Sequence, residues 1–163
     1  MGRAALPAFF AFGLLLYRSA GAAEGFDIDL QVKSAAAAAT AHSQEHEVPG
    51  KTAPRPQFKV KAGQALQVTW KLTNVMSEKF ADVIVHCYVV EEEKPGQNPL
   101  PRNEEQVPFE SAVSMDFKPS DHTGGKTSLK LTKPGFYLLR VETIGLASKT
   151  RAESFSTMDL VVE

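Results

Sequence analysis

Two histidines, His42 and His46, are the first candidates for chemistry in this sequence. They are four residues apart, so on a helical turn both imidazoles would share one face. With Glu45 or Glu47 beside them, they would offer the nitrogen and oxygen ligands that Zn²⁺ or Cu²⁺ prefers. The glutamate that directly follows the first histidine of metalloproteases is absent, because Ser43 stands there. The simpler interpretation of the same residues is a polar stretch of a mobile insertion, and a metal site at His42 and His46 is the alternative hypothesis.

Cys87 is the only cysteine of the chain, and it directly follows His86. Adjacent residues of a strand point to opposite faces, so these two side chains cannot share a ligand site. Cys87 is in register with the valines of its own strand, where a thiol behaves as a small apolar group. We therefore expect a buried structural cysteine, and no disulfide within the chain is possible.

Other patterns imitate known sites without completing them. Residues 124–127 (GGKT) resemble the end of a phosphate-binding loop, but Ser120 takes the place of the first glycine and a strand is predicted to follow. The glutamates at 91–93 and 104–105 would suit Ca²⁺, and they would also form an ordinary solvated charge run. No catalytic triad can be assigned on spacing from four histidines. We therefore expect neither an enzyme nor a bound cofactor.

The first 23 residues have the three parts of a secretory signal peptide. Arg3 precedes an apolar run at residues 6–17, and small residues at 19–23 would permit cleavage. The apolar run is short for a membrane span, because a spanning helix needs about 20 residues. We predict a secreted or periplasmic protein that loses residues 1–23 and does not insert into a membrane afterwards.

Residues 24–163 are enough for one domain with its own core. Without Arg3 and Arg18, 16 basic and 19 acidic residues remain, which gives a net charge of −3. That balance argues against nucleic acid as a partner and against an anionic membrane surface. We therefore expect the partner to be another envelope or extracellular protein.

Apolar and polar residues alternate with a period of two along most of this domain, which predicts strands with one buried face. The clearest alternation is that of Leu66, Val68, Trp70 and Leu72. Trp70 is expected at the centre of the core. Residues 82–90 are apolar on both faces, which is typical of a central strand. The residues expected to face inward at 107–117 are Phe109, Val113, Met115 and Phe117.

Residues 34–56 differ in kind, since five alanines precede a polar stretch and three prolines. A short alanine run is marginal as a helix in water, so we expect a flexible insertion. Residues 125–143 predict two strands joined at Pro134 and Gly135, a corner that passes from one sheet to the other. Tyr137 after this corner suggests a tyrosine corner whose hydroxyl bonds nearby backbone. The predicted fold class is all-β, an antiparallel immunoglobulin-like β-sandwich of seven to eight strands.

Three runs of the sequence follow the pattern of a known family: KVKAGQALQVTWKLTN, DVIVHCYVV and GGKTSLKLTKPGFYLLRVET. Over residues 58–143 the chain resembles bacterial exported immunoglobulin-like modules of the adhesion-related, CARDB-like kind. Those modules have a glycine-led strand ending in asparagine, a middle strand of alternating valines, and a P-G-x-Y-x-L-x-V corner. The resemblance implies a non-catalytic module that binds or spaces other parts at the cell surface.

The sequence thus predicts an exported, non-catalytic binding or scaffolding module. Its candidate contact surfaces are the loop at residues 91–106 and an exposed face around His86 and Tyr88. Two alternatives stay open. One is a periplasmic protein that binds copper or zinc through His42 and His46, and the other is an accessory carbohydrate-binding domain, which would need an exposed aromatic platform such as Trp70.

Overall fold

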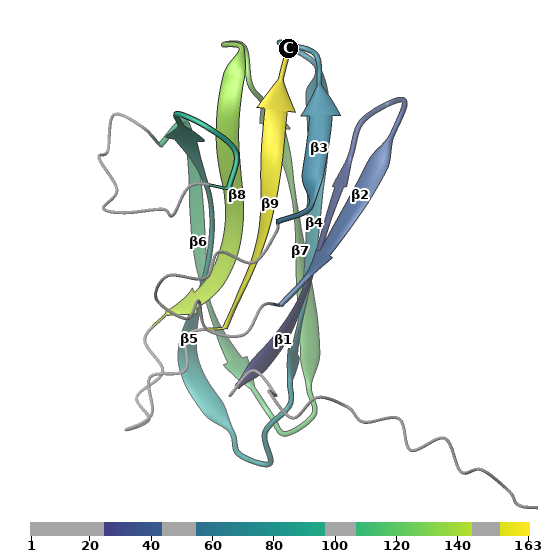
Figure 1. Ribbon diagram of the computed structural model, residues 1–163. Coiled ribbons are helices and arrows are strands. Elements are labelled where there is room, and N and C mark those ends of the chain that lie inside the picture. The colour runs from purple at the N-terminus through teal and green to yellow at the C-terminus, as the bar shows by residue number, and fades with distance from the viewer. Residues whose placement is uncertain (1–24, 44–54, 97–106, 145–153) are drawn as a thin grey trace, which may run out of the picture.

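The computed structural model describes residues 25–43, 55–96, 107–144 and 154–163. In this part of the chain nine β-strands form two sheets that pack face to face (Figure 1). Among the described residues no helix is long and apolar enough to cross a membrane. The predicted signal peptide, residues 1–23, lies outside the described residues.

The strands are divided between two mostly antiparallel sheets. Their bounds are β1 Phe26–Lys33, β2 Ala38–His42, β3 Gln57–Val60, β4 Ala65–Asn74, β5 Phe80–Glu92, β6 Phe109–Phe117, β7 His122–Lys130, β8 Gly135–Ile144 and β9 Phe155–Val162. Sheet A has the order β2-β1-β4-β7, and sheet B has the order β3-β9-β8-β5-β6. All neighbouring pairs are antiparallel except β3 and β9, which are parallel. The all-β prediction is confirmed.

Sheet A follows the predicted alternation of buried and wetter residues. In β4, Leu66, Val68, Trp70 and Leu72 are buried. The register places Leu30 of β1 opposite Trp70 of β4, so the apolar side chains of both strands lie on the same face. This face packs against sheet B, and the polar residues between face solvent.

Sheet B is buried on both of its faces in its central strands. In β5, every residue from Val85 to Val90 is buried, as are nearly all residues of β9. β5 lies between β8 and β6, which agrees with the central strand predicted at residues 82–90. Where a sheet is buried on both faces, the side chains on each face must be apolar or paired with another polar group. The buried polar residues of β5, β8 and β9 therefore need partners within the protein.

The corner between β7 and β8 carries the chain from sheet A to sheet B, as the sequence predicts. Pro134 and Gly135 lie at this passage, and Tyr137 follows in β8. The Tyr137 hydroxyl donates a hydrogen bond of 2.8 Å to the Lys133 carbonyl oxygen. This bond ties the start of β8 to the loop before it.

β2 corrects one prediction about residues 34–56, which the sequence assigned to a flexible insertion. Ala38–His42 is a strand that pairs with β1, with Ala41 buried opposite Leu30. Alanine and threonine give little apolar contrast, so periodicity alone does not detect this strand. It raises the count in the described residues to nine, above the seven to eight expected. Residues 44–54 lie outside the described residues.

Trp70 fills its place in the core because the facing residue has no side chain. Trp70 pairs with Gly125 of β7, and a Cβ built on Gly125 would overlap several atoms of the indole ring. Glycine is therefore required here by close packing and not by its backbone angles.

Gly125→Ala is expected to lower the free energy of unfolding by about 1–3 kcal/mol, because the added methyl group overpacks the indole of Trp70. Urea denaturation measures this loss. Ser128→Ala, on the outer side of the same strand, is the control and should stay within about 0.5 kcal/mol of the wild type. In the Trp70→Phe background the cost of Gly125→Ala should shrink, and an undiminished cost there would contradict the packing explanation.

Candidate functional site

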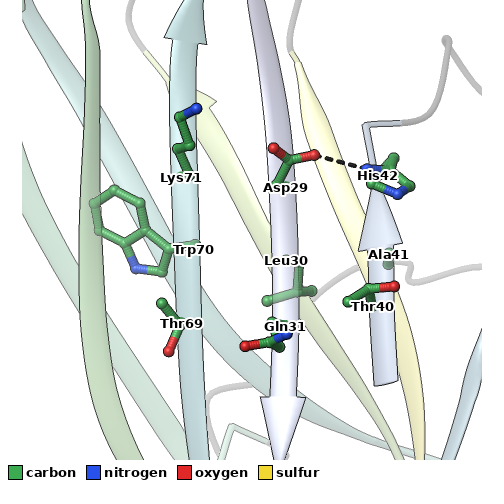
Figure 2. Close-up of a pocket in the computed structure, with 9 residues that line it drawn as sticks. All are labelled: Asp29, Leu30, Gln31, Thr40, Ala41, His42, Thr69, Trp70 and Lys71. Atoms are coloured by element: carbon green, nitrogen blue, oxygen red, sulfur yellow. Dashed lines mark hydrogen bonds and ion pairs between the residues drawn. The ribbon is translucent and has the colours of Figure 1, made fainter. Parts of the chain in front are cut away.

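A depression on the outer face of sheet A brings polar side chains from three strands together. Its cavity volume is about 290 Å³, and it crosses β2, β1 and β4 (Figure 2). The polar residues that line it are Asp29, Gln31, Thr40, His42, Thr69 and Lys71. They stand in two rows because the register aligns them across the strands: His42, Asp29 and Lys71 in one, Thr40, Gln31 and Thr69 in the other. We call these six residues the sheet A depression.

His42 and Asp29 form an ion pair at one side of this depression. Asp29 Oδ1 lies 2.7 Å from His42 Nδ1, and the side chains are 58% and 76% exposed. Lys71 stands on the other side of Asp29 in the same row (Figure 2). An imidazole and a carboxylate are thus held side by side in water on neighbouring strands.

The structure changes the basis of the predicted metal site. His42 is a strand residue, so it does not share a helical face with His46, and His46 lies outside the described residues. Within the described part of the chain, no group of three or more histidine, cysteine, aspartate or glutamate side chains is placed to hold a metal ion. The pair that the structure does bring together is His42 with Asp29, which the sequence did not link.

The outer face of sheet B has a different character, since several of its polar residues on the central strands are buried. His86 and Tyr88 are only 5% and 3% exposed, so the exposed contact face predicted around them is wrong. Their rings lie 4.8 Å apart, between centroids, on β5. Arg140 and Glu142 lie beside them on the adjacent strand β8, and Glu142 is buried as well. Side chains of neighbouring strands, rather than water, surround this face.

His86 is the centre of the first charged group on this face, the His86 cluster. Its Nε2 lies 2.5 Å from Glu110 Oε1, and its Nδ1 lies 3.4 Å from Glu142 Oε1. Arg140 Nε donates to the second oxygen of Glu142 at 2.6 Å. The Arg140 guanidinium also lies 4.0 Å over the ring of Phe155, a cation–π contact. Each carboxylate of this cluster therefore has a ring nitrogen or a guanidinium beside it.

Arg55, Glu92 and Asp159 form a second group, the Arg55 cluster. Arg55 Nη2 donates to both oxygens of Glu92, at 3.0 and 2.9 Å, and Arg55 Nε lies 2.8 Å from Asp159 Oδ1. All three side chains are almost fully buried. Burial raises the pKa of Glu92 and of Asp159, and the Arg55 guanidinium opposes that rise. The bidentate geometry makes Arg55 a clamp between β5 and β9.

The sequence missed the Arg55 cluster entirely. Arg55 falls in the stretch assigned to the flexible insertion, between two prolines, where no periodicity marks it. Its partners Glu92 and Asp159 are far away in sequence. An acidic residue within the apolar run of β9 is the one signal that could have suggested a buried cation nearby.

In the described structure, two of the three glutamates at residues 91–93 are paired with basic side chains and are not arranged around a Ca²⁺ site. Glu91 pairs with Lys133 at 2.7 Å, and Glu92 belongs to the Arg55 cluster. The glutamates at 104–105 lie outside the described residues, as does the loop at 97–106.

Cys87 and Trp70 both lie in the core between the sheets. Cys87 is buried, and burial raises the pKa of its thiol to about 12, so the thiol is a poor nucleophile and metal ligand. Trp70 is 7% exposed, with its indole over Gly125. It therefore cannot act as the exposed aromatic platform that the carbohydrate-binding alternative required.

No protein-family pattern matches the chain, and no curated protein matches it in sequence. Among solved structures, the chain is similar to the CARDB domain of PF1109 from Pyrococcus furiosus, with 11% identity and a TM-score of 0.49 over 84% of this chain and 94% of that domain. It is also similar to the PmoD soluble domain from Methylocystis sp., with 12% identity and a TM-score of 0.44 over 83% and 90%. The chain is similar to the C-terminal domain of Wzt as well, with 12% identity and a TM-score of 0.47 over 82% of this chain and 70% of that one. The weak CARDB-like resemblance of the sequence is thus present in the structure too.

Arg55→Met is expected to lower the free energy of unfolding by about 3–5 kcal/mol at pH 7.5, because it leaves two buried carboxylates without their cation. The loss should be smaller near pH 5. Burial holds the pKa of Glu92 and Asp159 above their unfolded values, so the folded state binds more protons. Stability linked to these groups is present at low pH and falls as pH rises through the folded-state pKa values. Removing the guanidinium raises the pKa of both carboxyls further, so the free energy of unfolding falls more between pH 5 and pH 7.5 in the variant than in the wild type.

Urea denaturation at the two pH values measures both effects. Lys59→Met is the matched control, because Lys59 is an exposed cation on β3 whose carboxylate neighbour, Glu163, is exposed too. Its free energy of unfolding should stay within about 0.5 kcal/mol of the wild type. An Arg55→Met loss that is equal at both pH values would contradict the assignment of the raised pKa values to the buried carboxyls.

Proposed function

We propose that this chain is an exported, non-catalytic binding module of immunoglobulin-like architecture, whose ligand is another envelope or extracellular protein. The architecture is supported by two packed sheets with a Pro-Gly crossing between them. The Tyr137 hydroxyl bonds to the backbone at this crossing, as in the tyrosine corners of such folds.

The state of the reactive groups supports a non-catalytic role. The Cys87 thiol is buried with a raised pKa. His86 is held between Glu110 and Glu142, neither of which is a nucleophile that a histidine base would activate. The Arg55 cluster satisfies its own charges in the same way. These groups stabilise sheet B, which leaves the binding function to the solvent-facing side of the molecule.

The observation that carries the proposal is the sheet A depression. It presents a cation, an anion, an imidazole, an amide and two hydroxyls from three paired strands. Small-molecule pockets are mostly apolar clefts of about 300–1,000 Å³ that enclose their ligand. A shallow hollow of about 290 Å³ on an open sheet face does not enclose a ligand in this way, and it suits one or two side chains of a protein surface better.

A photoreactive benzoylphenylalanine in place of Thr40 tests this proposal, because Thr40 is exposed at the rim of the sheet A depression. In the exported protein in its own host, illumination should give one defined protein adduct that mass spectrometry identifies. The same group in place of Lys59, an exposed residue of β3 on the outer face of sheet B, is the control. The purified partner should then bind the wild type at least tenfold more tightly than Thr69→Lys, which fills the hollow. Identical adducts from both positions, or no adduct, would refute the proposed surface.

A second candidate, metal binding, is favoured by the His42–Asp29 pair. Their nitrogen and oxygen atoms are 2.7 Å apart and exposed, and together they offer two of the ligands that Zn²⁺ or Cu²⁺ accepts.

Titration with Zn²⁺ or Cu²⁺ tests this candidate. Asp29→Asn and His42→Ala should each weaken binding by roughly tenfold or more, because each removes a ligand or its immediate neighbour. His122→Ala, an exposed histidine on β7, is the control. Affinity that is the same in all four proteins would remove the candidate.

A further inference from the structure

The two sheets have unequal numbers of strands, and the extra strand is at one edge. Sheet A has four strands and sheet B has five in the described residues. At one side β2 contacts β3 and β9, and next to it β1 contacts β9 and β8. Continuing in this order puts β4 across from β8 and β5, and β7 across from β5 and β6, so part of β6 extends beyond the last strand of sheet A.

The inner face of β6 is therefore only partly covered. Its inner side chains are those opposite the buried residues of β5: Phe109, Ser111, Val113 and Met115. Val113 is 40% exposed although it pairs with Val85, which is 1% exposed. The sequence predicted that Val113 faces inward, and it does, but no fifth strand of sheet A lies over it in the described structure.

The position missing from sheet A is beside β7. Among the described strands, β7 is an edge strand of nine residues that pairs with β4 on one side only, so one row of its backbone donors and acceptors meets no described strand. Its outward side chains include His122, Lys126 and Lys130 and no acidic residue. A strand that pairs here would cover Val113 with one face and meet basic side chains with the other.

β6 of a second copy has the sequence that this position requires. Its inner residues include Phe109, Val113 and Met115, and its outer residues include Glu110 and Asp116 and no basic residue. The short connection from Phe117 to His122 makes β6 and β7 run in opposite directions, so a strand pair between copies would be antiparallel. Because this connection is short, Asp116 lies at about the same height along the strand direction as His122, and Glu110 at about the same height as Lys130.

We propose that this chain forms a twofold dimer in which β6 of each copy pairs with β7 of the other. The rotation axis runs parallel to the strands, midway between the sheets, because only such an axis exchanges the two sheets and keeps strand direction. Sheet A of one copy then continues into sheet B of the other, which gives two nine-stranded sheets. The uncovered faces of the two β6 strands pack on each other, so one contact buries both apolar patches and pairs both charged edges.

Sedimentation equilibrium of the purified protein tests this assembly. The wild type should be a dimer at micromolar concentrations. Val113→Lys should weaken dimerisation by at least about 100-fold, because it buries two like charges at the axis. Ile84→Lys is the matched control, since Ile84 is 39% exposed on the neighbouring strand but points to the outer face of sheet B. Its dimer should be unchanged.

Charge variants and hydrogen exchange locate the contact independently of folding. Lys126→Glu on β7 should weaken the dimer, whereas Lys33→Glu on β1, two strands away on the same face, should not. In the wild type, amides of β7 should gain protection as concentration rises, and those of the edge strand β2 should not. A monomer at all concentrations, or a dimer that survives Val113→Lys, would overturn the proposal. Neither result bears on the sheet A depression, which is tested separately.

Discussion

The burial of sheet B on both faces is the constraint on which the rest of the structure depends. The buried charged residues of β5, β8 and β9 are largely removed from water, so each needs an opposite charge inside the protein. Arg55 pairs with both Glu92 and Asp159, and Arg140 pairs with Glu142 beside His86. These pairs align neighbouring strands, and they also occupy the side chains that would otherwise be available for acid–base chemistry.

Sheet A is free of this constraint on its outer side, and its polar residues behave differently. Asp29, His42 and Lys71 are arranged by strand register and remain in solvent. The buried charges of sheet B thus pair within the protein, whereas the charged side chains on the outer face of sheet A point into solvent. Binding by a rigid sheet face needs little reordering of backbone, so a partner would not have to compensate for the loss of loop entropy.

Most of the fold could be predicted from the sequence, because local alternation decides it. The alternation in β4, the central position of β5 and the Pro134–Gly135 crossing were predicted from residues within a few positions of one another. β2 was missed, because its alanines gain their burial only by pairing with β1. The exposure of His86 and Tyr88 was predicted wrongly, and Arg55 was missed, because both depend on strands that are distant in sequence. Only part of the sheet A depression could be predicted from the sequence, because His42 was a candidate metal ligand and its neighbour Asp29 was not.

The place of β9 in sheet B has a consequence for the order of events during folding. β9 is the last of the described strands, yet it lies between β3 and β8, and in the described residues β3 pairs with β9 alone. Sheet B therefore cannot be completed until residues 155–162 have been synthesised, and β3 waits for a partner that follows it by about a hundred residues. Such a long-range parallel pairing is expected to form late in folding, because the closure of a long loop precedes the contacts that compensate for it.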